Sequence, residues 1–446
     1  MSAIENETVK NKKIGRKAAV AATVGTIIEW YDFFLYATAS ALIFPKLFFP
    51  TSDPYIGTLQ SFGTFAVGFF ARPVGAAIFG HYGDRIGRKT ALVLTMFLMG
   101  ISSLVIGLLP TYQSVGMWAP ILLVLLRLIQ GIGVGGEWGG SVLLSMEWGD
   151  KKRQALMGSW PQMGVSAGLL LASIMISIFM YISGDGFFIW GWRIPFILSV
   201  VLLIVGYVIR AKIPETPSFR KVQEQQKVSR MPVMDVLKNH PRMVLLAALV
   251  RLSENGPFYV YTVFIINFGM EMFKMDKAFF VNANTVGSLV MVFGIPFFGY
   301  LSDRIGIRRM YLIGVATTFA WAFAYVGLIS TGIPLALFLA TVLSMIPHSM
   351  QVGPQGAMLA HCFPPRLRYS GLSLGTQFGA IIAGGFAPLI CMYLWHTLGT
   401  AYAISFYIAG AAVITFCATL LLRNYTETAS LDKVEEKEES KEVLSV

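Results

Sequence analysis

Two carboxylic acids interrupt an apolar stretch near the start of the chain. The stretch reads GTIIEWYDFFLY over residues 25–36 and places Glu29 and Asp32 three positions apart, on one face of a helix. An ionisable side chain inside a membrane-spanning segment is costly and marks a functional site. A carboxyl group in such surroundings can exchange a proton near neutral pH. We therefore predict that this pair carries a proton, with Asp32 as carrier and Glu29 as its tuning or salt-bridged partner; the reverse assignment is the alternative.

Further ionisable side chains stand in other apolar segments. Arg251 and Glu254 are three residues apart on one helix face, and Arg127 lies about ten residues into its segment. A guanidinium presents a planar pair of donors to a carboxylate, so we predict that Arg127 and Arg251 bind an acidic substrate. Glu254 and His348 are the remaining candidate proton carriers. Arg72 lies close to a polar loop and is predicted to be structural.

Several polar residues of the same segments are candidate substrate ligands. Glu137 either binds substrate or pairs with an arginine to fix helix packing. Tyr36, Gln130 and Gln351 are predicted to form hydrogen bonds with the substrate, and ordinary packing is the alternative for each.

The composition indicates a polytopic membrane protein. Of the 446 residues, 55% are hydrophobic and only 13% are charged, whereas soluble domains carry about 25% charged residues. The mean hydropathy is +0.64. The net charge of +11 lies in short loops and has no accompanying nucleic-acid motif, so we predict no nucleic-acid partner. Three cysteines are too few for a disulfide framework or a metal site.

Twelve apolar segments are long enough to cross a membrane as helices. They are continuously apolar, without the alternation of barrel strands. The predicted spans are 18–44, 57–80, 90–110, 117–146, 155–182, 190–210, 243–268, 279–301, 310–330, 333–360, 367–395 and 399–422.

The distribution of lysine and arginine predicts the orientation. With the N-terminus inside, 28 of the 35 basic residues fall in cytoplasmic segments, which places both termini in the cytoplasm. The predicted divisions are a cytoplasmic tail (1–17), a six-helix bundle (18–210), a cytoplasmic connector (211–242), a second six-helix bundle (243–423) and an acidic cytoplasmic tail (424–446).

A short motif repeats after the second and the eighth segments. The loops read GHYGDRIGRK (80–89) and GYLSDRIGIRR (299–309), so that Asp84 and Asp303 are 303 − 84 = 219 positions apart. Parallel repeats of six helices are a transporter architecture. An aspartate can cap a helix N-terminus, and the arginines can pair with acids such as Glu147. We therefore predict a cytoplasmic gate formed by Gly80, Asp84, Arg85, Gly87, Arg88, Lys89, Glu147, Asp303, Arg304, Gly306, Arg308 and Arg309.

These loops resemble the signature of the major facilitator superfamily, although Ile307 is inserted in the second copy. RLIQGIGVGGEWGG (127–140) is similar to a second motif of that superfamily. EWYDFFLY, ARPVGAAIFGH and WGWRIPF resemble its metabolite:proton symporter branch, and RLSE (251–254), PHSM and RYSG resemble the shikimate-type permeases within it. The resemblance implies that the first, fourth, seventh and tenth helices line a central cavity. Gly131, Gly133 and Gly136 also fit a dinucleotide fingerprint, but inside an apolar helix they indicate close helix packing.

The resemblance and the residues together predict an all-α carrier with twelve transmembrane helices in two six-helix bundles. It would sit in the cytoplasmic membrane as a monomer and import a small organic acid with a proton by alternating access. A zwitterion such as proline or betaine, or a di- or tricarboxylate, is the alternative substrate. No nucleophile–base arrangement, metal-ligand set or cofactor motif is present in the sequence, so we predict neither an enzyme nor a cofactor.

Overall fold

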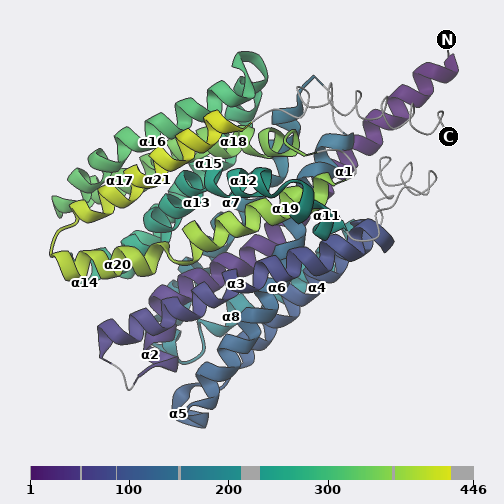
Figure 1. The fold of residues 1–446 in the computed structure, drawn as a ribbon. Coiled ribbons are helices and arrows are strands. Elements are labelled where there is room, and N and C mark those ends of the chain that lie inside the picture. The colour runs from purple at the N-terminus through teal and green to yellow at the C-terminus, as the bar shows by residue number, and fades with distance from the viewer. Residues whose placement is uncertain are drawn as a thin grey trace.

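The computed structural model describes residues 2–50, 53–86, 88–148, 152–211, 232–363 and 367–422. In these ranges the chain is helical, and the long helices lie side by side in one bundle (Figure 1). An apolar segment in lipid must satisfy its backbone hydrogen bonds internally, and a helix does so within one segment. Large apolar side chains such as Phe293 and Phe406, about 70% and 67% exposed, cover the outside of the bundle, as a lipid-facing surface requires.

The first half of the chain contains six long helical runs. Their elements, with the short helices between them, are α1 (Ser2–Leu42), α2 (Phe44–Phe48), α3 (Pro54–Ile86), α4 (Arg88–Leu108), α5 (Tyr112–Val115), α6 (Trp118–Trp148), α7 (Gln154–Ser183), η1 (Gly184–Phe188), α8 (Arg193–Ile197) and α9 (Ser199–Ala211).

The second half contains six more runs, which follow the short helix α11 (Pro232–Asn239) in the predicted connector. Their elements are α12 (Pro241–Val250), α13 (Leu252–Tyr259), η2 (Val260–Phe264), α14 (Ile265–Phe273), α15 (Lys277–Ile305), α16 (Ile307–Ser330), α17 (Pro334–Leu343), α18 (Met345–Ala360), α19 (Arg368–Gly379), η3 (Ala380–Gly385), α20 (Ala387–Leu398) and α21 (Tyr402–Leu421). Each of the twelve predicted spans falls on one run.

Ten of the described helices are long and apolar enough to cross a membrane. The other two predicted spans are 18–44, which overlaps α1, and 243–268, which is divided among α12, α13, η2 and α14. α1 begins at Ser2, inside the segment that the sequence predicted as an N-terminal tail. The sequence pattern thus located the helices but missed the early start of α1.

Glycines allow α3 and α6 to pack backbone against backbone. A Cβ atom added to Gly131 would lie 2.1 Å from the carbonyl oxygen of Gly68, and one added to Gly135 would lie 2.0 Å from that of Arg72. Real Cβ atoms cannot approach so closely, so only glycine fits at these positions. The predicted role of the glycine-rich stretch in helix packing is confirmed.

Two helical runs of the second half, α12–α14 and α19–α20, are interrupted, whereas the corresponding helices of the first half, α1 and α7, are each a single element. α12 ends at Val250, Arg251 forms a turn, and α13 runs only to Tyr259 before the π-helical turn η2. A second π-helical turn, η3, separates α19 from α20. Such interruptions are concentrated at functional sites. Here the first one places Arg251 and Glu254 inside the bundle.

The two halves meet along α7, which packs against α15 and α18, and along α19, which packs against α3 and α6. We call the end of the bundle where α9, α15 and α21 terminate the terminal face, and the end that carries α2 and α5 the far face (Figure 1). Contacts between the halves occur at both ends. Near the far face, Tyr55 stacks on His396 at 4.1 Å between ring centroids, and Ser177 contacts Asn282 at 3.2 Å.

Candidate substrate and proton sites

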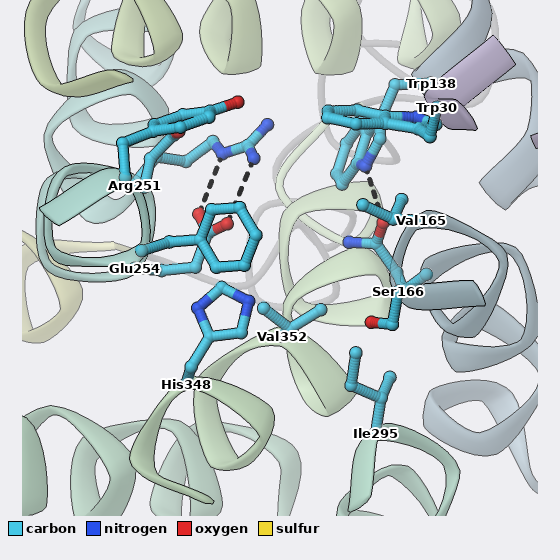
Figure 2. A pocket seen from close by; sticks show the side chains of 13 residues that line it. Trp30, Trp138, Val165, Ser166, Arg251, Glu254, Ile295, His348 and Val352 are labelled. Atoms are coloured by element: carbon cyan, nitrogen blue, oxygen red, sulfur yellow. Dashed lines mark hydrogen bonds and ion pairs between the residues drawn. The ribbon is translucent and has the colours of Figure 1, made fainter. Parts of the chain in front are cut away.

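A small cavity lies between the two halves. One wall consists of Trp30, Trp138, Val165 and Ser166 of the first half, and the facing wall carries Arg251, Glu254 and His348 of the second half (Figure 2). The remaining lining residues are Gln162, Asn255, Phe258, Tyr259, Ile295 and Val352. The cavity is therefore built by α1, α6 and α7 on one side and by α13, α15 and α18 on the other.

Arg251 and Glu254 form an ion pair inside this cavity. Arg251 Nε donates to Glu254 Oε2 at 3.2 Å, and Arg251 Nη2 donates to Glu254 Oε1 at 3.3 Å. Gln355 Nε2 also donates to Glu254 Oε2, at 3.1 Å. The Arg251 guanidinium lies 5.0 Å from the ring centroid of Trp138, so it reaches across to the first half. The sequence prediction paired these two residues on one helix face, and the structure places both in the cavity.

His348 lies beside this pair and has an apolar neighbour. Its ring stacks on Phe258 at 4.6 Å between centroids, and its Nδ1 has no hydrogen-bond partner among the described residues. On the opposite wall, Trp138 Nε1 donates to Gln162 Oε1 at 2.7 Å. The two walls therefore present one ion pair, one imidazole and two indole rings to whatever fills the cavity.

The cavity has a volume of about 30 Å³. One water molecule needs roughly 10–15 Å³ measured in this way, so this volume admits about two waters and no organic acid. Together with the contacts between the halves at both faces, this indicates an occluded state. A transported molecule would have to separate the walls in order to enter.

Arg127 and Asp32 lie outside the cavity, within the first half. Arg127 Nη1 donates to Gln130 Oε1 at 3.1 Å, and Gln130 Nε2 donates to Ser103 at 2.7 Å. Asp32 accepts a hydrogen bond from Ser199. Gln130 thus binds Arg127 and Ser103, and in this state neither Arg127 nor Gln130 reaches the cavity that the sequence assigned to them.

Aromatic rings surround the two buried arginines of the first half. The Arg127 guanidinium lies 4.2 Å from the ring centroid of Tyr36 and 4.5 Å from that of Phe33. Arg72 lies 4.5 Å from Phe33 and 4.0 Å from Phe69. A cation over an aromatic face is stabilised by the ring quadrupole. Both arginines thus pack among aromatic rings of the first half, and the structural role of Arg72 stays a prediction.

Glu29 and Glu137 converge on an arginine that the sequence analysis missed. Arg210 Nη1 lies 2.9 Å from Glu29 Oε1, and Arg210 Nη2 lies 3.1 Å from Glu137 Oε1. Thr26 and Ser141 each donate to Glu137 Oε1 at 3.1 Å. Of the two predictions for Glu137, substrate binding and pairing with an arginine, the structure shows the pairing. Arg210 ends an apolar segment next to a basic loop, so its position in the sequence resembles that of an ordinary cytoplasmic charge. Only its burial reveals that it pairs with the two glutamates.

Two predicted substrate ligands bind their neighbours instead of facing the cavity. Tyr36 donates to Thr64 Oγ1 at 2.8 Å within the first half. Gln351 accepts from Ser253 and donates to Thr318 Oγ1, both at 2.6 Å, within the second half. In the occluded state the hydrogen-bonding groups of both side chains are thus used in packing, the alternative that the sequence left open.

The predicted gate has two copies of one motif, and the structure describes the side chains of the second copy. Asp303, near the end of α15, accepts from the backbone N–H groups of Ala155 and Leu156 at 2.9 and 3.0 Å. It therefore caps the N-terminus of α7 and joins the halves at the terminal face. His361 contacts Gln154 close by. Burial, and then the charge of Arg368, lower the pKa of His361, so its ring is neutral at physiological pH.

The other predicted gate residues have varied positions. Arg304 lies 4.5 Å from the ring centroid of Tyr300, Arg308 Nη2 donates to Leu420 O at 2.5 Å, and Lys89 Nζ donates to Ala211 O at 2.7 Å. Gly306 has φ +104° between α15 and α16, and Arg309 is exposed in the first turn of α16. Gly80 faces α19, and Glu147 lies near the end of α6. The predicted residues Asp84, Arg85, Gly87 and Arg88 lie outside the part of the chain whose side chains are described.

The contact of Asp303 with α7 leads to a prediction for the terminal face. Asp303→Asn removes the charge that stabilises the first N–H groups of α7, and loss of such a cap costs about 1 kcal/mol. We expect hydrogen–deuterium exchange at Ala155 and Leu156 to become about fivefold faster, because this cost weakens the contact by that factor. Asp276→Asn is the matched control, since Asp276 caps α15 itself at Ala278 N. Equal acceleration at α7 in both variants would show that Asp303 does not hold the halves together.

Two family models match the chain. The model described as "Sugar (and other) transporter" covers residues 17–244, and the model of the Major Facilitator Superfamily covers residues 258–445. The chain belongs to the major facilitator superfamily. Within this superfamily, it is 38% identical to the inner membrane metabolite transport protein YhjE of Escherichia coli, over 93% of this chain and 95% of that protein. It is also 38% identical to the shikimate transporter of Escherichia coli, over 92% and 94%.

A solved structure of this superfamily has the same fold. The proton:xylose symporter XylE of Escherichia coli superposes with a TM-score of 0.71 and 17% identity, over 93% of this chain and 97% of that one. The predicted all-α fold with twelve membrane helices is therefore confirmed. The chain is a membrane transporter of the major facilitator superfamily, whose matched family models and relatives are transporters and not enzymes.

Proposed function

We propose that this transporter imports a small organic acid together with a proton by alternating access. The observation that carries the proposal is the buried Arg251, which faces the central cavity between the halves (Figure 2). A guanidinium holds a carboxylate through two parallel hydrogen bonds. In this structure the carboxylate of Glu254 accepts from two donors of Arg251. A substrate carboxylate would take the place of Glu254 on Arg251.

The charge balance of the cavity supports uptake of a proton with the acid. Among the described lining residues, Arg251 and Glu254 carry one positive and one negative charge, so the lining of the cavity is neutral. An anion that entered alone would leave a net negative charge in a low-dielectric interior, which is costly. A proton that accompanies the anion restores neutrality. The same argument does not apply to a zwitterion, which brings no net charge.

The direction of transport rests on the predicted orientation. The excess of lysine and arginine on one side supports a cytoplasmic terminal face, in a bacterial inner membrane such as that named for YhjE. The proton gradient across such a membrane drives protons inward, and a coupled acid would move with them. The similarity to the shikimate transporter makes hydroxylated ring acids of that kind the first substrates to examine.

Uptake by the purified protein in liposomes tests this proposal. We expect labelled shikimate, or another organic acid that raises the thermal stability of the protein, to accumulate when the outside is made acidic. Collapse of the pH gradient with a protonophore should abolish accumulation, while exchange against unlabelled acid continues. Uptake of proline or betaine with no uptake of any organic acid would refute the proposed substrate class.

A further inference from the structure

Two buried arginines of the first half have no acidic partner in the described structure. Arg72 on α3 and Arg127 on α6 are only 3% and 0% exposed. In each side chain, Nε and Nη2 have no hydrogen-bond partner among the described residues. The ion pairs of the described chain involve Arg210 and Arg251 instead. Because a low-dielectric interior penalises a lone charge, two buried cations with unused donors need an explanation.

The four buried acids of the described chain are held elsewhere. Three of them form the ion pairs with Arg210 and Arg251, and the fourth, Asp32, accepts a hydrogen bond from Ser199. The other two guanidiniums therefore remain a local excess of positive charge. Their unused N–H groups fit the oxygens of an anion that comes from outside the chain.

The two arginines share one aromatic ring. Both guanidinium carbons lie 4.5 Å from the ring centroid of Phe33, so they are within twice that distance of each other. Arg127 also lies 4.2 Å from the centroid of Tyr36, and Arg72 lies 4.0 Å from that of Phe69. Aromatic faces stabilise a cation, but they offer no oxygen to its N–H groups. A carboxylate that displaced the Phe33 ring could bind donors of both arginines.

The arginine pair lies between the cavity and the far face. α6 begins at the far face, and Trp138, which lines the cavity, follows Arg127 by three turns, roughly 16 Å along the helix. Tyr259 of the second half lines the cavity too, and its ring lies 5.5 Å from that of Phe69 between centroids. An acid that enters from the far face therefore meets the arginines before it reaches Arg251, once Tyr259 has moved away.

We propose that Arg72 and Arg127 form a loading site, which binds the carboxylate of the organic acid before it passes to Arg251. This inference rests on the proposed function. When the halves separate at the far face, Tyr259 leaves with the second half and the Phe33 ring turns aside. Because the loading site is positively charged, the acid binds there as an anion, and it needs the proton only in the neutral cavity. Arg72 then binds substrate, where the sequence predicted a structural role.

The first experiment measures anion binding without transport. Thermal midpoints are compared in acetate, in its neutral isostere acetamide and in chloride, at equal concentration. The background is the double variant Arg251→Gln with Glu254→Gln, which removes the ion pair of the cavity. We expect acetate to raise the midpoint more than acetamide or chloride does. Adding Arg72→Gln or Arg127→Gln should abolish this difference, because each removes donors for the anion and leaves no acid without its partner.

Arg193→Gln is the matched control. Arg193 donates to the carbonyls of Gly107 and Leu109, so its replacement should leave the preference for acetate unchanged. Arg127→Lys keeps the charge without the planar fork and should retain only part of the preference. A midpoint in acetate equal to that in acetamide or in chloride would overturn the proposal, in the second case because the pair then serves an inorganic ion. A preference that persists in both glutamine variants would overturn it as well.

The second experiment measures loading in liposomes for which the wild-type protein accumulates an organic acid. Arg72→Gln and Arg127→Gln should each raise KM about tenfold, the factor of one charge-assisted hydrogen bond, with the maximal rate nearly unchanged. A fall in the maximal rate at an unchanged KM would mean that the arginines only support the fold. If the wild-type protein accumulates no acid, the proposed function fails, and the midpoints in acetate still decide whether the pair binds a carboxylate.

Discussion

Replacement of Arg251 by Gln is expected to weaken the binding of an organic acid about a hundredfold. Truncation of one partner of a buried charge pair costs roughly 2–5 kcal/mol, and each 1.4 kcal/mol is about a factor of ten in affinity. Arg251 faces the cavity and already holds a carboxylate, that of Glu254, through two hydrogen bonds. The variant loses both the charge and the planar donors that a substrate carboxylate needs.

The measurement compares the acid with its neutral amide by calorimetry on purified variants. Arg251→Gln should affect the acid far more than the amide, and Arg251→Lys should restore binding only in part, because an ammonium is a point charge without a planar fork. The double variant Arg251→Gln with Glu254→Gln removes the unpaired acid left in the cavity and serves as the control for folding. Equal losses for acid and amide would mean that Arg251 supports the cavity without binding the carboxylate.

Replacement of Arg210 by Gln is expected to cause a large loss of stability. Removing one partner from a buried ion pair costs roughly 3–5 kcal/mol, because an uncompensated charge remains. Here two carboxyls, Glu29 and Glu137, would be left without their cation. Thermal unfolding in detergent should show a much lower midpoint for Arg210→Gln than for Arg193→Gln. Arg193 donates to the carbonyls of Gly107 and Leu109, so its replacement loses hydrogen bonds but leaves no carboxylate.

A second substitution separates charge from packing. If charge causes the loss, Glu29→Gln introduced together with Arg210→Gln should recover part of the stability, because only one carboxyl then needs a proton. The thermal midpoints of the two single variants and the double variant form a cycle that measures this coupling. Strictly additive losses would show that Arg210 acts only by filling space between α1, α4 and α6.

The helices were predictable because the membrane leaves few choices to an apolar run of about twenty residues. Their bounds follow from where polar loops begin, as at Asp303 and Gly306. The division of the seventh run was not predictable from hydropathy, because the turn at Arg251 and the π-helical turn η2 interrupt the helix without making the segment less apolar overall. Composition over a window identifies a span but cannot show where its hydrogen-bond ladder breaks.

The candidate site was predictable in its residue types but not in its grouping. The cost of a buried charge identified Glu29, Asp32, Arg127, Arg251 and Glu254. Which of these residues contact one another depends on how helices far apart in the sequence pack together. The spacing of apolar and polar residues along the chain does not contain that information. Arg210 shows the limit most clearly: it stands beside a basic loop, yet it is buried against Glu29, 181 residues away.

The interrupted helices also distribute mechanical stiffness unequally along the molecule. α4 and α6 run without a break, Pro73 and Pro161 each remove one hydrogen bond from α3 and α7, and the α12–α14 and α19–α20 runs each contain a whole π-helical turn. A helix bends most easily where its ladder is broken. The two runs with π-helical turns are therefore the compliant parts of the second bundle. Because Glu254 lies on α13, directly before η2, strain introduced at the cavity can bend this run at its π-helical turn.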